Sequence, residues 1–155
     1  MGSDLPGPQV LVTVECGAET PDAEEVADEA RKVLGALGLG PDSELSVLLV
    51  DDRRIHELNR EWRDRDRPTD VLSFPQLEPG EAVRGPLGDV VLNVDALPRQ
   101  AAEHGLTPGE ELRFLLIHSA LHLLGHDHHG EEQRAAMEAE EQRIWVALGG
   151  RGRIR

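Results

Sequence analysis

The sequence predicts a single α+β domain in which a small mixed four-stranded sheet packs with four to five helices. Two observations support this fold class. The chain has 155 residues, which is the size of one ordinary domain. Four short runs rich in β-branched residues alternate with amphipathic helical patterns, and no repeat or low-complexity linker divides them. We therefore expect residues 1–155 to form one domain, with flexible ends at 1–8 and 150–155.

The chain is expected to begin with a strand, a helix and a second strand. QVLVTVEC (9–16) is rich in β-branched residues, which favour a strand. Thr20 and Pro21 then predict the start of a helix, with the threonine as N-cap and the proline in the first position. Apolar residues keep a helical spacing from there until Gly38. The run ELSVLLV (44–50) predicts the second strand.

A short helix and two more strands follow. An aspartate at 51–52 is expected to cap the helix, and Trp62 continues its apolar pattern. TDVLSF (69–74) predicts the third strand and DVVLNV (89–94) the fourth. The segment between them, 75–88, is rich in proline and glycine and is predicted to be a mobile turn region.

Three helices are predicted after the fourth strand. The first ends near Gly105. The second begins at TPGE (107–110), which has the pattern of a capping box with proline at the first helical position. It continues through an apolar run until Gly125, a residue that can adopt the left-handed conformation of a helix end. The last helix is expected at 131–148.

The charge balance of the chain is acidic, with 30 Asp and Glu against 16 Lys and Arg and a net charge of −14. This balance argues against a general nucleic-acid binder, because phosphate affinity comes from cationic patches. We expect no DNA partner. The single cysteine, Cys16, excludes an internal disulfide. The sequence shows no secretory leader and no apolar run long enough to span a membrane, so we expect a cytoplasmic protein without a membrane partner.

One segment departs from this acidic balance. Residues 53–67 contain six arginines against four acids, namely Glu57, Glu61, Asp64 and Asp66. The segment is the best candidate for a local anion-binding surface, although a solvated loop whose charges pair with one another would have the same composition.

The run IHSALHLLGHDHHG (117–130) holds five of the seven histidines. His118 and His122 are four residues apart, so a helix would direct both imidazoles to one point. A bend at Gly125 would let His128 return as a third ligand. Three neutral imidazoles leave a fourth coordination position open, as catalytic zinc sites do. We expect one Zn²⁺ per chain, held by His118, His122 and His128.

The neighbouring residues leave alternatives open. A lone histidine on an apolar helix face is usually a core residue, but three with a glycine at the bend favour a metal site. His126 and His129 fit the ligand spacing less well and are expected to flank the site. Asp127 is a candidate for orienting a ligand through a hydrogen bond, and a role in the turn is about as plausible.

The histidine spacing also occurs in metzincin peptidases, where a glutamate follows the first histidine and acts as general base. Ser119 occupies that position here and cannot serve as the base. We expect its hydroxyl to bond back to a carbonyl one turn earlier in the helix. A metallopeptidase is therefore the runner-up interpretation, and a non-catalytic zinc-binding module is a second alternative.

Three stretches of the chain resemble the YbeY family of bacterial endoribonucleases. They are HSALHLLGHDH (118–128), LNREWRDRDRPTDVLSFP (58–75) and LGDVVLNVD (87–95), in the order expected for that family. They are spread over much of the region from 44 to 148. Two residues depart from the family pattern, with Ser119 in place of glycine and His126 in place of tyrosine.

The resemblance implies a metal-dependent endoribonuclease specific for single-stranded RNA. It implies zinc bound by the three histidines. It implies a role in 16S rRNA 3′-end maturation and in ribosome quality control, with the rRNA precursor and the small ribosomal subunit as partners. The non-catalytic alternative would then be a zinc-containing ribosome assembly factor. The resemblance also places the family's functional arginine on Arg63, so Arg63 and His118 are the expected catalytic residues. Arg63 is expected to lie in a charged loop and to act on the substrate, pairing with phosphate oxygens.

Overall fold

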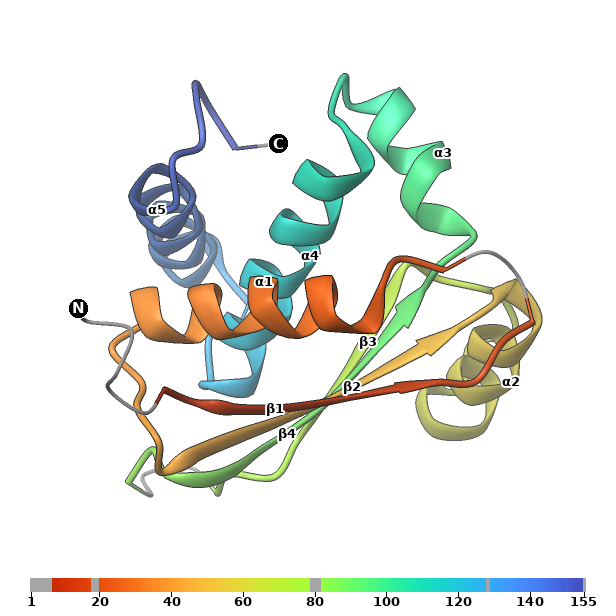
Figure 1. The fold of residues 1–155 in the computed structure, drawn as a ribbon, viewed down its shortest axis with the longest axis horizontal. Coiled ribbons are helices and arrows are strands. Elements are labelled where there is room, and N and C mark those ends of the chain that lie inside the picture. Colours follow the sequence, from red (N-terminus) through yellow and green to blue (C-terminus); the bar gives the residue numbers. More distant parts are fainter. Residues whose placement is uncertain (1–6, 18–19, 79–81, 128, 155) are drawn as a thin grey trace.

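The computed structural model describes residues 7–17, 20–78, 82–127 and 129–154, and Figure 1 shows the arrangement of its elements. The described residues form four strands and five helices, which confirms the predicted fold class. In chain order these elements are β1 (Gln9–Val14), α1 (Ala23–Ala36), β2 (Ser43–Val50), α2 (Asp52–Arg63), β3 (Val71–Pro75), β4 (Gly85–Asn93), α3 (Ala96–Glu103), α4 (Pro108–Leu123) and α5 (Glu131–Ala147).

The four strands form one mixed sheet in the order β1-β2-β4-β3. β1 pairs with β2 and β2 with β4 in parallel, whereas β3 pairs with β4 antiparallel. The interior strands β2 and β4 are rich in valine and leucine, as strands buried on both faces are. β3 is an edge strand of the sheet. Its outer side lies next to α4, and the two elements are in contact.

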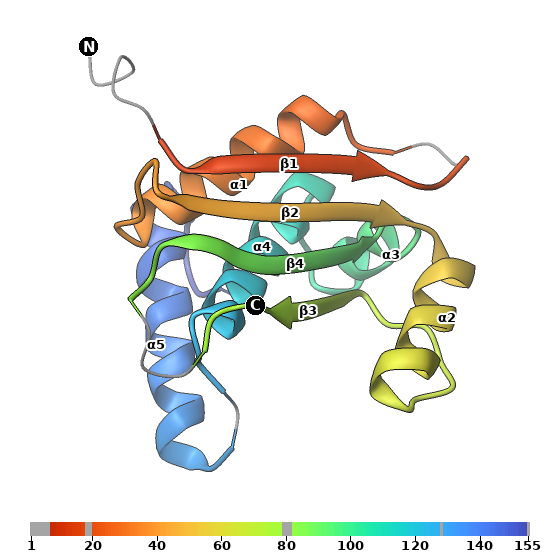
Figure 2. The same ribbon diagram turned by 90° about the horizontal axis from the view of Figure 1, so that it is seen from below.

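Helices cover the two faces of the sheet unequally (Figures 1 and 2). One face is covered by α1, α3, α4 and α5. On the opposite face, α2 packs against one end of the sheet. The side chains of β4 alternate accordingly. Val90 and Leu92 join the main hydrophobic core, whereas Val91 joins a smaller cluster with Ile55 and Leu58 of α2.

α4 is the central helix of the main core. It packs against α1, α3, α5 and β3, and most of its residues are buried, including Leu115, Ile117 and Leu121. Its start has the predicted capping box: the Thr107 side chain accepts from the Glu110 backbone N–H at 3.1 Å, and the Glu110 carboxylate accepts from that of Thr107 at 2.9 Å. The predicted helix start is therefore confirmed.

Side chains tie the start of α2 to the end of the sheet. The carboxylate of Asp52 accepts hydrogen bonds from both terminal nitrogens of Arg99 at 3.0 Å and from the amide of the buried Asn93 at 2.7 Å. The hydrogen bonds from Arg99, and then that from Asn93, lower the pKa of Asp52 below its ordinary value. This network holds α2 at a defined angle to β4 and α3.

Some predicted boundaries were wrong. The N-cap of α1 is Asp22 and not Thr20, because the Asp22 carboxylate accepts from the Glu24 backbone N–H at 2.8 Å. β4 begins at Gly85 and not at 89, so part of the segment predicted as a mobile turn region is a strand paired with β2. Local composition hid this pairing, since its hydrogen bonds are formed with a strand some forty residues away.

One further side chain differs from the sequence expectation. Trp62 was predicted on the apolar face of α2 but is 64% exposed.

At the C-terminal end of the chain, residues 150–154 pack on α5. Ile154 is buried and donates its backbone N–H to Gln142 at 2.8 Å, and the Trp145 indole donates to the Arg151 carbonyl at 3.3 Å. Among the described residues, no helix is both long and apolar enough to cross a membrane.

Candidate metal centre and adjoining groove

His118 and His122 lie one turn apart near the end of α4 and are both half-buried. Their Nε2 atoms are 3.2 Å apart, and the two rings meet edge to face at 77°. Two imidazole ligands on one tetrahedral zinc, each bonded at about 2.0–2.1 Å, would place their nitrogens about 3.3 Å apart. The pair therefore fits the spacing that two zinc ligands require.

A carboxylate from another helix contacts the far side of the His118 ring. Glu141 of α5 has an Oε2 atom 2.7 Å from His118 Nδ1, and its side chain is only 7% exposed. A carboxylate at this distance can accept a hydrogen bond from a protonated Nδ1. In that tautomer the lone pair of Nε2 is available to a metal.

The end of α4 follows the predicted glycine bend. Gly125 has a φ of 100°, in the left-handed region. Its backbone N–H donates to the His122 carbonyl at 3.0 Å, and the next N–H, of His126, donates to the Leu121 carbonyl at 3.0 Å. This pair of bonds is a Schellman motif, which ends the helix immediately after the two histidines.

The third predicted ligand, His128, lies outside the described residues. Next to it in the sequence, the exposed His129 has its Nε2 atom 3.3 Å from Oδ2 of Asp127. Within residues 7–17, 20–78, 82–127 and 129–154, no group of three His, Cys, Asp or Glu side chains is arranged to hold a metal ion. The described residues thus supply the pair His118 and His122, and the assignment of His128 stays a prediction.

An open groove of about 630 Å³ runs past the two histidines. One wall comes from α4 and the loop after it, and includes His118, His122 and His126. The opposite wall comes from the end of α2, the arginine-rich loop and β3. The structure therefore brings Arg63 and the histidine pair, which are far apart in the sequence, into one groove.

Arg63 is the last residue of α2 and not a loop residue as predicted. The helix ends at Asp64, which adopts a left-handed conformation with a φ of 55°. The Arg63 side chain is exposed, and its Nη2 donates to the Ser73 carbonyl of β3. Its guanidinium carbon lies 5.1 Å from the centroid of the Phe74 ring. These two contacts orient the guanidinium along the groove wall.

The loop after α2 presents two more arginines to the groove, Arg65 and Arg67. The buried side chain of Asn59 organises this loop by donating to the Arg67 carbonyl at 2.9 Å, and the Asn59 carbonyl accepts from the Arg65 backbone N–H at 3.2 Å. Sequence reasoning found the arginine cluster but not the asparagine that shapes it, since one polar residue in a short helix gives no distinct signal.

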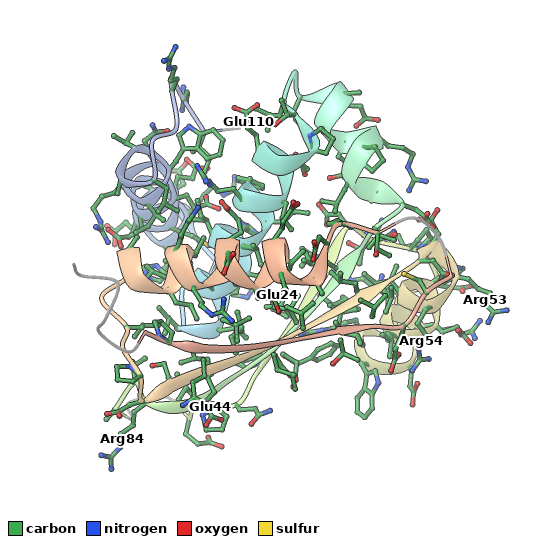
Figure 3. The ribbon with its side chains drawn as sticks, in the orientation of Figure 1. Glu24, Glu44, Arg53, Arg54, Arg84 and Glu110 are labelled. Atoms are coloured by element: carbon green, nitrogen blue, oxygen red, sulfur yellow. The ribbon has the colours of Figure 1, made fainter. Side chains whose placement is uncertain are left out.

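The acids of this segment only partly neutralise its arginines. Asp66 accepts from His56 at 2.8 Å and lies 3.8 Å from Arg60, both on α2. In the part of the chain that the structure describes, no acidic side chain forms an ion pair with Arg65 or Arg67. Arg53 and Arg54 project outward from the start of α2 (Figure 3), and neither lines the groove. The groove wall is therefore cationic in a chain of net charge −14.

Ser119 points away from the groove. It is fully buried in α4, and its hydroxyl has no hydrogen-bond partner among the described residues. The bond predicted to a carbonyl one turn earlier is absent there. Because Ser119 follows His118 by one residue, about 100° around the helix, its side chain faces the core and not the metal position. It cannot reach a substrate in the groove.

Comparisons with known proteins relate this chain to one family. A family model described as Endoribonuclease YbeY matches residues 13–149. The chain is 43% identical over 144 residues to Endoribonuclease YbeY of Azorhizobium caulinodans, covering 90% of this chain and 91% of the relative. It is 47% identical over 120 residues to Endoribonuclease YbeY of Pelotomaculum thermopropionicum, covering 74% and 78%. The solution structure of a Thermotoga maritima protein is similar, with a TM-score of 0.57 and 27% identity, covering 89% of this chain and 91% of that one.

Proposed function

The chain belongs to the YbeY family of endoribonucleases, and from this premise we propose that it cleaves single-stranded RNA in a zinc-dependent reaction. The observation that carries this proposal is that two groups suited to this chemistry line one groove. The Nε2 atoms of His118 and His122 lie 3.2 Å apart, and Arg63 lines the same groove. We infer that a phosphodiester bound in this groove contacts both groups.

The histidines and Arg63 of the groove would make different contributions to phosphodiester hydrolysis. Zinc, when bound by His118, His122 and the predicted third ligand His128, would lower the pKa of a coordinated water to about 7 and polarise a phosphoryl oxygen. Arg63 is already held by Ser73 and Phe74, so its remaining N–H groups can pair with phosphate oxygens without reorganisation. No carboxylate base is required at the position of Ser119.

We propose that the natural substrate is the 3′ end of precursor 16S rRNA, cut in the cytoplasm on or near the small ribosomal subunit. The charge distribution supports this choice. Arg63, Arg65 and Arg67 attract phosphates at the groove, whereas the net charge of −14 repels RNA from the rest of the surface. A protein of this kind would need a ribosomal partner to deliver its substrate, and ribosome quality control is the corresponding biological role.

The outer edge of β3 argues against the peptidase alternative. Asp70 and Gln76 form backbone hydrogen bonds with the β4 segment, so alternate residues between them face β4. Ser73 and Pro75 consequently present their backbone groups to the groove. The Ser73 carbonyl already accepts a hydrogen bond from Arg63, and Pro75 has no backbone N–H to donate. A peptide could not add to this edge as a further strand without displacing Arg63.

The test is cleavage of an end-labelled single-stranded RNA by the zinc-loaded protein, with a duplex of the same sequence as control. We expect cleavage of the single strand alone, lost on chelation and in His118→Ala. Binding without cleavage would favour the non-catalytic assembly factor. Digestion of a denatured protein substrate by the same sample, with the RNA left intact, would overturn the proposal in favour of a peptidase.

A further inference from the structure

Glu141 is a buried charged residue that the reaction proposed above does not use. It lies on the face of α5 that packs into the core with Met137, Ile144 and Trp145, and the residue is 5% exposed. A carboxylate out of water is costly unless it is paired or hydrogen-bonded. Its hydrogen bond to His118 Nδ1, at 2.7 Å, supplies such a partner.

The location of this bond excludes two other roles for Glu141. The carboxylate contacts Nδ1, whereas the Nε2 atom on the opposite side of the ring faces His122. Glu141 is thus separated from the metal position by the width of an imidazole and cannot be a ligand through this geometry. It is not among the residues that line the arginine-walled groove either, so no direct contact with a phosphate in that groove is assigned to it.

The bond instead controls which His118 nitrogen carries the proton. A neutral imidazole has one protonated nitrogen, and the hydrogen bond made by one nitrogen decides the state of the other. A carboxylate at Nδ1 keeps the proton there and leaves Nε2 free to bind. The Phe114 ring stacks on the same imidazole with centroids 5.6 Å apart and an interplanar angle of 26°, so His118 is held both at its edge and on its face.

We propose that Glu141 is a positioning residue of the metal centre, which locks His118 in the Nδ1–H tautomer and in the orientation that converges with His122. The inference rests on the proposed metal centre, since it assigns Glu141 a role toward that group. It also makes the centre depend on the packing of α5 against α4. Loss of such a partner of a metal ligand weakens metal binding by about 10–100-fold.

The neighbouring residue offers a matched control. Glu140 is on the same helix and differs from Glu141 by facing the surface, where its two carboxylate oxygens pair with Arg143 at 2.8 and 2.9 Å. Glu140→Gln and Glu141→Gln remove the same charge and preserve side-chain size. A difference between the two variants therefore reports the contact with His118.

Two measurements test the role. Long-range ¹H–¹⁵N NMR of the zinc-free wild-type protein should show His118 protonated at Nδ1, and Glu141→Gln should lose this fixed tautomer. Competition with a chromophoric chelator should show zinc binding weakened about 10–100-fold in Glu141→Gln and unchanged in Glu140→Gln. A residue that only supports the fold would lower the melting temperature of the zinc-free protein without changing the tautomer or the zinc affinity of the folded fraction.

The outcomes separate this inference from the proposed function. Zinc bound equally tightly by wild type and Glu141→Gln, or a wild-type His118 protonated at Nε2, overturns the role of Glu141 and leaves the metal centre intact. A wild-type protein that binds no zinc overturns the metal centre and the role of Glu141 together. Should Glu141→Gln fail to fold, the wild-type tautomer still decides the question, because its measurement needs no variant.

Discussion

Replacement of Arg63 by alanine separates the contribution of this residue to the fold from its contribution to the reaction. The side chain is exposed and makes two contacts with β3, a hydrogen bond to the Ser73 carbonyl and a stack on Phe74. A hydrogen bond contributes about 0.5–1.5 kcal/mol and an exposed cation–π contact about 0.5–1 kcal/mol. We therefore expect Arg63→Ala to lower the free energy of unfolding by about 1–2 kcal/mol.

The effect on catalysis should be much larger than the effect on stability. A loss of about 1–2 kcal/mol shifts the melting temperature of a domain of this size by about 2–8 °C, which leaves the protein folded at room temperature. Removing a donor that stabilises transition-state charge costs about 100–1,000-fold in rate. Arg63→Ala should thus retain its zinc while RNA cleavage falls by that factor, and Arg63→Lys should rescue only part of it, because lysine lacks the bidentate fork.

The assay measures single-turnover cleavage of a labelled RNA, zinc content and thermal unfolding on the same preparations. Arg60→Ala is the control, because Arg60 is an exposed α2 residue whose nearest acid, Asp66, is 3.8 Å away and which does not line the groove. It should cleave at the wild-type rate. If Arg63→Ala lost activity only in proportion to its folded fraction, Arg63 would be a structural residue and the assignment of its role would be wrong.

Three further predictions follow from other residues. His128→Ala should lose zinc and His126→Ala should keep it, as measured by metal analysis; the reverse result would move the third ligand to His126. Asp52→Asn should destabilise the protein near pH 7, because Arg99 lowers the pKa of Asp52 in the folded state and so stabilises its charged form. This contribution is fully present above the unfolded-state pKa of about 3.9 and is lost as the pH falls through the lower folded pKa, so urea titrations of the two proteins should converge only in that acidic range. A constant difference at all pH values would refute the charge argument. Ser119→Gly should cost about 1 kcal/mol at most and leave the rising limb of the pH–rate profile of RNA cleavage in place, whereas a shifted limb with zinc still bound would mean that Ser119 takes part in proton transfer.

Local sequence was sufficient to predict the elements whose bonds are formed between near neighbours. The capping box that begins α4 joins residues three apart, and the Schellman motif that ends it at Gly125 joins residues three to five apart. The spacing of His118 and His122 within that helix determines that their side chains share one face. Features that depend on residues distant in the sequence were harder to predict. β4 begins at Gly85 because β2 is there to pair with it, and Trp62 is exposed because α2 covers only one end of the sheet.

The sequence by itself thus determined the fold class, the histidine pair and the presence of a cationic segment. Only the tertiary structure decided that Arg63 lines the same groove as that pair, and that Glu141 of α5 lies within hydrogen-bonding distance of His118 of α4. The physical reason is that each of these relations joins side chains on different elements, and their separation in space depends on how the elements pack. α5 contains four other glutamates, and no spacing rule distinguishes Glu141 from them. Burial against α4 does, because it removes one carboxylate from water and leaves it beside an imidazole.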